Sequence, residues 1–423
     1  MQHKLNKLSN GLRLLIVPLP SMESSTVTVW VKTGSRNETK QIGGLSHFLE
    51  HMVFKGSKKR PSAKEIAVVI DSIGGEFNAG TSKEWTNFYI KAHNEALPTA
   101  FDVLSDMVLN PLLKPEDIER EKGVILEELA MYEDTPMFKI GDVFENLIYK
   151  NSSLGRDIIG TRDSIKGVKR ADFDRYRKIH YGIDNILITV AGGAKEKDIM
   201  KLAEKYFGSL KNNNKETAKK YKKDQKKPRV LLYPKKKEQG HFILGFLAGQ
   251  MGNKDRFTES VLSVILGGGM SSRLFTEVRE KRGLAYLVKT SIDRYVDTGY
   301  IGTYAGVDIK RIDEAIKVVL SEHYQIASGK NIISSNELKK AKEYIKGHLA
   351  LSLEDTRAVG SFFGLKELLL GKIDTPEDVF KGIDGVTIND VLRVAKEFFV
   401  PERLNLAIIG PYKDQKRFEK LVS

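Results

Sequence analysis

The chain has 423 residues, of which 41% are hydrophobic and 29% charged, and it contains 36 glycines and 12 prolines. The length predicts two to four domains. The composition is typical of a folded soluble protein, and it excludes collagen-like, low-complexity and wholly disordered proteins. Cysteine is absent, which excludes disulfides, catalytic thiols, iron–sulfur clusters and Cys-ligated zinc. A metal site in this chain must therefore use histidine, carboxylate or backbone oxygen.

The N-terminal segment does not have the pattern of a secretory signal peptide. Its longest apolar stretch, residues 14–20, is too short for the core of a signal peptide and has no small-residue cleavage site. No window of the chain approaches 18 consecutive apolar residues, so we expect no membrane-spanning segment and no membrane partner. These observations favour a cytoplasmic protein.

Hydrophobic periodicity predicts both strands and helices along the first half of the chain. Strand composition is found at residues 27–31, 77–82, 86–93 and 186–193. Apolar residues at helical spacing are found at residues 62–74, 97–108 and 114–134. The last of these helices has a proline and acidic residues in its first turn, which is a favourable helix start.

A polar, lysine-rich stretch follows the first half. Residues 211–228 are interpreted as an interdomain linker that separates a domain at 1–210 from a domain at 229–423. Much of the net charge of +14 lies between residues 215 and 237. A solvated linker and turn is the favoured interpretation, and no nucleic-acid-binding module surrounds the run, so no nucleic-acid partner is expected. A basic nucleic-acid-binding protein is kept as an alternative.

The two halves resemble each other. Residues 180–192 align without gaps on residues 398–410, and the tripeptide Glu-Asp-Thr occurs at 133–135 and again at 354–356. The strand at 25–35 has a counterpart at 240–249. The pattern therefore predicts an α+β fold of two tandem homologous domains, each a mostly antiparallel sheet with helices packed on it.

The segment from Gly43 to Gly56, GGLSHFLEHMVFKG, carries a metal-binding pattern. His47 and His51 are four residues apart, so on a helix both imidazoles project from one face and can bind one zinc ion. Glu50 lies on the same face, where its carboxylate can touch a metal-bound water without being a ligand. H-x-x-E-H is the inverted zincin motif. The alternative is an amphipathic helix whose histidines happen to lie near a core.

A catalytic zinc has three protein ligands and an open position for water. The helix at 114–134 supplies candidates for the third, because Glu121 and Glu128 lie seven residues apart on one face, whereas Glu127 points elsewhere. Spacing within the helix does not choose between Glu121 and Glu128.

Three segments, HFLEH, GGEFNAGTSKEWTNFY and EREKGVILEE, resemble the pitrilysin or insulinase superfamily of zinc peptidases. The length and the duplication resemble the branch that contains the β-subunit of mitochondrial processing peptidase and its bacterial relatives. This resemblance implies one zinc ion per chain with Glu128 as the third ligand and Glu121 as a functional carboxylate that orients a ligand. It also implies that Asn78, Ala79 and Thr81 lie in an edge strand that binds substrate peptide by strand addition.

The second half contains no H-x-x-E-H, and its equivalent helix reads FTESVLSVILGGG. It does contain Arg279 and Tyr286 at the spacing of the R-x6-Y pair of this superfamily, which implies donors that hold the substrate backbone and the developing oxyanion. A surface arginine and a packing tyrosine are the alternative.

The resemblance further implies a clamshell chamber of four repeats, of which this chain has two. Arg279 and Tyr286 of one subunit are then expected to complete the zinc site of another, in a homodimer or in a heterodimer with an inactive homologue. The predicted activity is that of a zinc metalloendopeptidase that hydrolyses unfolded peptides or extended segments, with Glu50 as general base. The alternative function is that of a non-catalytic partner subunit in an assembly of the processing-peptidase kind.

Overall fold

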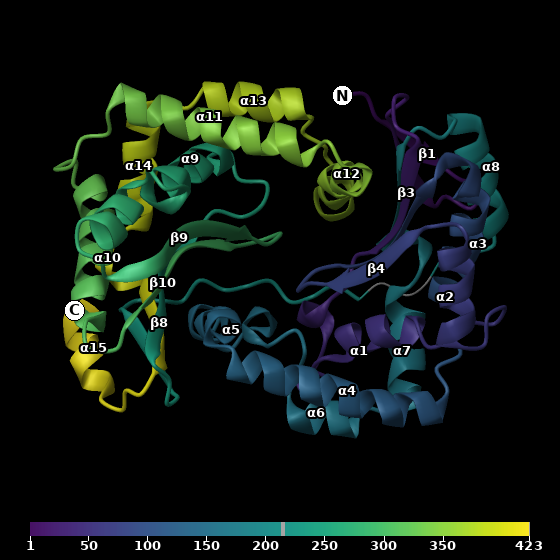
Figure 1. Ribbon diagram of the computed structural model, residues 1–423, viewed down its shortest axis with the longest axis horizontal. Helices are drawn as coiled ribbons and strands as arrows, with labels where there is room; N and C mark the ends of the chain where they lie inside the picture. Colours follow the sequence, from purple (N-terminus) through teal and green to yellow (C-terminus); the bar gives the residue numbers. More distant parts are fainter. Residues whose placement is uncertain (213–215, 423) are drawn as a thin grey trace. The chain divides into compact units, whose positions relative to one another are not determined.

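The computed structural model describes residues 1–212 and 216–422, so residues 213–215 of the predicted linker and Ser423 lie outside the described residues. The chain forms two compact units, which are considered one at a time (Figure 1). Unit 1 comprises Met1–Ala130, Arg156–Lys219 and Ala350–Thr375. Unit 2 comprises Met131–Gly155, Lys220–Leu349 and Pro376–Ser423.

Unit 1 is built on a six-stranded sheet with the order β1-β2-β6-β3-β5-β4. Its strands are β1 (Lys4–Lys7), β2 (Arg13–Pro18), β3 (Ser24–Val31), β4 (Glu76–Thr81), β5 (Thr86–His93) and β6 (Ile186–Gly192). All pairings are antiparallel except that between β2 and β6. Every residue of β6 is buried, as expected for a strand covered on both faces.

Unit 2 is built on a five-stranded sheet with the order β7-β11-β8-β10-β9. Its strands are β7 (Arg229–Pro234), β8 (Gln239–Ala248), β9 (Ala285–Arg294), β10 (Gly299–Asp308) and β11 (Leu404–Gly410). The pair β7 and β11 is parallel, and the other pairs are antiparallel.

The two sheets share one topology. The parallel pair β2–β6 of unit 1 corresponds to β7–β11 of unit 2, and in both sheets the next three strands follow in the same antiparallel order. The aligned segments 180–192 and 398–410 end in β6 and β11, which are both seven residues long and fully buried. The predicted α+β fold of two tandem homologous domains is therefore confirmed.

Helices cover the faces of both sheets. Those of unit 1 are α1 (Leu45–Val53), α2 (Ala63–Ser72), α3 (Leu97–Leu109), α4 (Pro115–Asp134, whose last turn is assigned to unit 2), α6 (Arg162–Gly167), α7 (Arg170–His180), α8 (Glu196–Phe207) and α12 (Thr356–Leu370). Those of unit 2 are α5 (Pro136–Ile148), α9 (Arg256–Gly267), α10 (Ile312–Ala327), α11 (Ser335–Ser352, whose last residues are assigned to unit 1), α13 (Pro376–Asp384), α14 (Ile388–Phe398) and α15 (Gln415–Val422). The helices predicted at 62–74, 97–108 and 114–134 correspond to α2, α3 and α4.

One helix of each half belongs to the unit built mainly by the other half. Helix α12, from the second half, packs on β3 and β6 of unit 1, and helix α5, from the first half, packs on β8 and β11 of unit 2. Each follows one of the repeated Glu-Asp-Thr tripeptides. The division into 1–210 and 229–423 separates the homologous halves of the sequence, and it stays a prediction. Each compact unit contains segments from both halves.

Glycines permit the close approach of these two helices to their sheets. A Cβ on Gly364 of α12 would lie 2.7 Å from Nε1 of Trp30 on β3. A Cβ on Gly245 of β8 would lie 2.7 Å from the ring of Phe144 on α5. Both distances are too short for a carbon contact, so any larger residue would push the helix away from the sheet.

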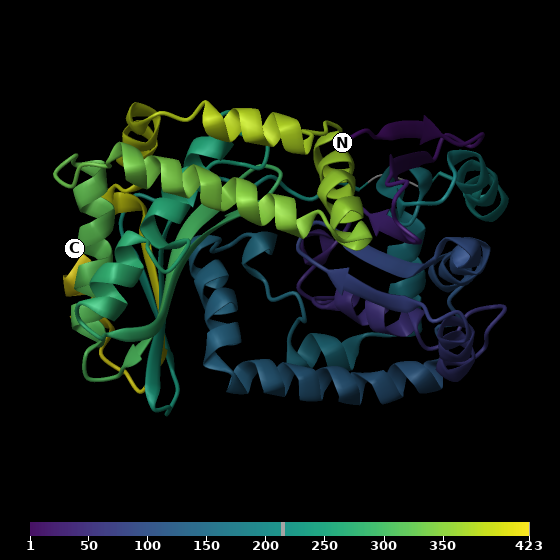
Figure 2. The same ribbon diagram turned by 45° about the horizontal axis from the view of Figure 1, so that its top comes forward.

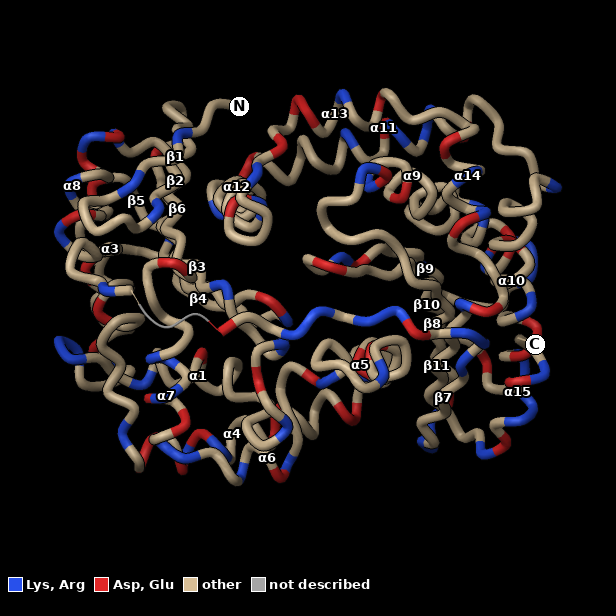
Figure 3. Tube along the Cα trace, turned by 180° about the vertical axis from the view of Figure 1, so that it is seen from behind, with Lys and Arg blue, Asp and Glu red and all other residues tan. Residues whose placement is uncertain are grey.

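Among the described residues, no helix combines the length and the apolar character that crossing a bilayer requires. Six of the nine residues at 219–227, within the predicted linker, are lysine, and Figure 3 draws this part of the linker largely in blue.

Candidate functional site

Helix α1 presents the H-x-x-E-H motif on its polar face. His47, Glu50 and His51 are partly exposed, whereas the six residues Leu45, Ser46, Phe48, Leu49, Met52 and Val53 are buried. Phe48 packs edge-on against Phe173 of α7, with ring centroids 5.1 Å apart. The apolar face of α1 thus fixes the rotation of the helix, and this rotation turns the motif away from the core.

The residue that precedes α1 packs closely against the backbone at Ile159. Gly44 has a φ of 91°, and a Cβ at this position would lie 2.3 Å from the carbonyl oxygen of Ile159. The buried carboxylate of Glu38 accepts hydrogen bonds from the backbone N–H groups of Gly44 (2.7 Å) and Ser46 (2.6 Å). Glu38 therefore satisfies the free N–H groups that the first turn of a helix leaves open, and it fixes the position of the motif.

Three side chains converge at the polar face of α1. Nε2 of His47 and Nε2 of His51 lie 3.6 Å and 3.5 Å from Oε2 of Glu128 on α4, and the three ligand atoms lie within 4.8 Å of one another. In a tetrahedral zinc site, ligand atoms at usual bond lengths lie about 3.4 Å apart. Figures 1 and 2 show α1, in purple, beside the long blue helix α4.

The protonation of these groups fits metal binding. Burial, together with the charge of His51, lowers the pKa of His47 to about 3, so its imidazole is neutral and its nitrogen lone pair is available. Burial raises the pKa of Glu128, and the nearby carboxylate of Glu121 adds to this effect. A cation bound between the three side chains would remove the cost of holding a carboxylate there.

Glu121 contacts the ring nitrogen of His51 that does not face Glu128. Its Oε1 lies 2.9 Å from Nδ1 of His51, and its Oε2 lies 2.6 Å from Nζ of Lys55. Burial by itself would raise the pKa of Glu121, but the hydrogen bonds and charges of His51 and Lys55 lower it overall, so the carboxylate is ionised. An ionised Glu121 accepts the Nδ1 proton of His51, which leaves Nε2 of that ring as the free ligand atom.

Glu50 lies beside the three converging groups without being one of them. Its Oε2 accepts a 2.5 Å hydrogen bond from Oγ1 of Thr81 on β4. Burial raises the pKa of Glu50, and the Thr81 hydrogen bond opposes this shift. A carboxylate with a raised pKa in this position is suited to taking up and releasing a proton.

Asn78, Ala79 and Thr81 lie on β4, which is the edge strand of the unit 1 sheet. Strand β4 pairs with β5 on one side, so its other edge has backbone groups available for an added strand. Thr81 also links this edge strand directly to Glu50.

Arg279 and Tyr286 lie in unit 2. Arg279 is in a short π-helical turn, η5 (Phe275–Glu280), and Tyr286 is at the start of β9. The guanidinium of Arg279 lies 4.7 Å from the ring centroid of Phe275 and 4.8 Å from that of Tyr286. Tyr286 is 80% exposed, so it does not pack in the core of its unit. The structure thus brings the pair together, but does not place it relative to the groups on α1 and α4.

Comparisons with known proteins show which family this chain resembles. Residues 13–162 match the model of the insulinase family of peptidases (family M16), and residues 167–345 match the model of the M16 inactive domain. A zinc protease of Streptomyces coelicolor, described as uncharacterized, is 36% identical over 97% of this chain and 90% of its own length. One of Bacillus subtilis is 38% identical over 95% of this chain and 97% of its own.

This chain belongs to the insulinase family. The crystal structure of a protease from Helicobacter pylori, 25% identical, superposes with a TM-score of 0.90 over 97% of this insulinase-family chain and 100% of that chain. The resemblance stated from the sequence is confirmed, including the half-length architecture. In the second half, the helix equivalent to α1 is α9, where Glu259 is fully buried and bonded to Arg294.

Two residues near the insulinase-family motif have positions that the sequence argument did not identify. Lys55 follows His51 by four residues, so the spacing that paired the histidines also pointed to a cation beside them. Glu38 precedes Gly44 by six residues, outside any helix period, and only the fold brings its carboxylate to the start of α1. No signal in the sequence distinguished Glu38 from other acidic residues.

Proposed function

We propose that this chain is a zinc-dependent endopeptidase that hydrolyses unfolded peptides or extended segments. The observation that carries the proposal is the convergence of Nε2 of His47, Nε2 of His51 and Oε2 of Glu128, with the carboxylate of Glu50 beside them. Two imidazoles and a carboxylate form one of the donor sets that bind catalytic zinc with an open position.

A zinc ion held by these three residues would supply Lewis-acid polarisation of the scissile carbonyl and a lower pKa for the attacking water. Glu50 takes a proton from that water as it attacks the carbonyl carbon, and then gives the proton to the departing amine. Thr81 holds the Glu50 carboxylate in place through its hydrogen bond, and Glu121 holds the ring of His51.

The free edge of β4 supports a binding mode for the substrate. We infer that an extended peptide adds to this edge as a further strand, so that backbone hydrogen bonds provide affinity that does not depend on sequence. A folded protein does not expose such a segment, so the substrates are unfolded. Asn78, Ala79 and Thr81 would contact the peptide in this arrangement.

Arg279 and Tyr286 are proposed to hold the substrate backbone and the oxyanion in the zinc site of a second subunit, which makes the active enzyme a dimer. The 80% exposure of Tyr286 supports this proposal, because a tyrosine that packs in its own unit would be covered. A homodimer is the simplest such assembly, and a heterodimer with an inactive homologue has the same geometry. Cytoplasmic location stays a prediction from the sequence.

The second candidate function, a non-catalytic partner subunit, is less well supported. A subunit that acts only as a partner does not need His47, Glu50, His51 and Glu128, and all four are present and close together.

Hydrolysis of a quenched library of unstructured peptides tests the main proposal. The wild-type protein is expected to cleave the library, to lose this activity with a chelator and to regain it when one equivalent of zinc per chain is added back. Cleavage that continues in the chelator at zero bound zinc would contradict the metal-dependent mechanism.

Mixing two inactive variants tests the proposed sharing of residues between subunits. Glu50→Gln and Tyr286→Phe are each expected to be inactive as homodimers, and mixing them is expected to restore about a quarter of wild-type activity, because about half of the dimers are mixed and each mixed dimer has one intact site. Heterodimer formation is checked by native mass spectrometry. If mixed dimers form and no activity returns, the sharing in trans is wrong.

A further inference from the structure

A peptide that adds to the edge strand β4 has side chains on two faces of the sheet, and each face meets different residues of the protein. In the register with β5, Asn78 lies opposite Tyr89 and Glu76 lies opposite Lys91, so these four side chains project to one face of the sheet. Helix α12 packs on this face of the sheet over β3 and β6, and Thr356 in its first turn bonds to Thr26 of β3, the residue opposite Lys91. The side chain of Thr81, on the opposite face, bonds to Glu50 of α1.

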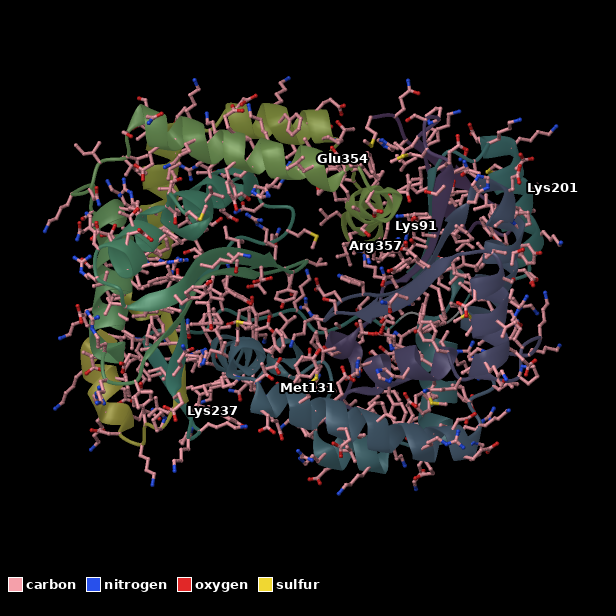
Figure 4. All side chains as sticks on the ribbon, viewed as in Figure 1. Lys91, Met131, Lys201, Lys237, Glu354 and Arg357 are labelled. Atoms are coloured by element: carbon pink, nitrogen blue, oxygen red, sulfur yellow. The ribbon has the colours of Figure 1, made fainter. Side chains whose placement is uncertain are left out.

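The first turn of α12 places charged groups on this face. Lys91 donates a 2.6 Å hydrogen bond to Asp355, and Asp355 also caps the helix by accepting the N–H of Ala358. Arg357 donates a 2.8 Å hydrogen bond to the hydroxyl of Tyr89, and its guanidinium lies 5.2 Å from the centroid of that ring. Figure 4 labels Lys91 and Arg357 side by side at this end of α12.

Lys91 and Arg357 differ in whether a carboxylate pairs with their charge. Lys91 forms an ion pair with Asp355, whereas Arg357 has no carboxylate within 4.0 Å among the residues that the structure describes. Asp355 and Glu76 act on Arg357 only at longer range. Arg357 is exposed, and Tyr89 occupies one of its five donors. The guanidinium is therefore held in place with most of its donors unused.

We propose that Arg357 selects an acidic side chain in the peptide that adds to β4, at the position opposite Asn78. This inference rests on the proposed function and names a substrate class for it, extended segments with Asp or Glu at one defined position. The residue opposite Asn78 projects to the face of Tyr89 and Arg357, because paired residues of neighbouring strands point to the same side. A carboxylate there can accept two N–H groups of the planar guanidinium.

The period of a strand makes this preference specific to alternate positions. Peptide residues opposite Phe77 and Ala79 project to the α1 face and cannot reach Arg357. The preference is thus expected at the position opposite Asn78 and absent at its two neighbours, which serve as internal controls.

The experiment uses unstructured peptides that differ only in having Asp, Asn or Lys at one of several successive positions. The wild-type protein is expected to prefer Asp over Lys at one position by roughly fivefold to tenfold in kcat/KM, as for an exposed ion pair whose replacement also brings repulsion. Arg357→Gln is expected to remove this preference and Arg357→Glu to reverse it, with each rate expressed relative to that of the same variant on the Asn peptide. The matched control is Lys201→Glu, an equal change of charge on the exposed face of α8, which is expected to leave the preference unchanged.

Binding separates this inference from the proposed function. The dissociation constants of the Asp and Lys peptides are measured by fluorescence anisotropy with Glu50→Gln protein and with the Glu50→Gln, Arg357→Glu double variant. Selective binding of the Asp peptide that reverses in the double variant supports the role of Arg357 even where the wild type cleaves nothing. An equal affinity for both peptides, no binding of either, or an unchanged preference in Arg357→Glu would overturn it.

Discussion

Replacing Glu50 with glutamine is expected to lower kcat by about 10³-fold to 10⁴-fold while the protein still binds one zinc ion. Glutamine keeps the shape of the side chain and can still contact Oγ1 of Thr81, so the local structure is retained. It cannot take up a proton from water at neutral pH, so the step that activates the nucleophile is lost. Because Glu50 contributes none of the three converging ligand atoms, the zinc affinity of Glu50→Gln is expected to differ little from that of wild type.

The matched control for this variant is Glu127→Gln. Glu127 lies on α4 next to Glu128, is exposed, and carries the same change from carboxylate to amide. It is expected to keep kcat within about twofold of wild type, as is usual for an exposed substitution. The measurements are initial rates on one quenched peptide and zinc content by mass spectrometry. Glu50→Gln protein that holds zinc and cleaves at the wild-type rate would remove Glu50 as the general base.

Glu128→Gln and Glu121→Gln are expected to weaken zinc binding to different extents. Glu128 provides the oxygen that faces both Nε2 atoms at 3.5–3.6 Å, so its replacement by a neutral amide removes a ligand charge. Glu121 bonds to Nδ1 of His51 and acts on the metal only through that ring. Loss of such a supporting contact usually costs about 10-fold to 100-fold in metal affinity, and we expect a considerably larger loss for Glu128→Gln.

Competition with a fluorescent chelator gives the zinc dissociation constants of the two variants and of wild type. Circular dichroism and the midpoint of thermal unfolding, both measured on the zinc-free proteins, show whether either substitution alters the fold. Equal losses in the two variants, or a larger loss in Glu121→Gln, would contradict the assignment of Glu128 as the third ligand. Unchanged zinc binding in both would mean that α4 holds neither the ligand nor its support.

Local periodicity in the sequence predicted which side chains share one face of a helix, and internal repetition predicted two equivalent sheets. The four-residue spacing of His47 and His51 and the three-residue spacing of Glu50 determine that these side chains share one face of α1, because the geometry of a helix is the same wherever it packs. The alignment of residues 180–192 on 398–410 predicted two equivalent sheets, since the same pattern of buried strands has the same way of covering its apolar faces.

Contacts between distant elements depended on the tertiary structure. Spacing on α4 left Glu121 and Glu128 equivalent, and only the packing of α4 beside α1 directs Glu128 to Nε2 of both histidines and Glu121 to Nδ1 of His51. Likewise, nothing local to Arg357 connects it with β4, which lies more than 270 residues earlier in the chain. The sequence determined which residues share a face of one element, because that follows from backbone geometry. The tertiary structure decided which faces meet, because that depends on how the apolar surfaces of many elements are buried together.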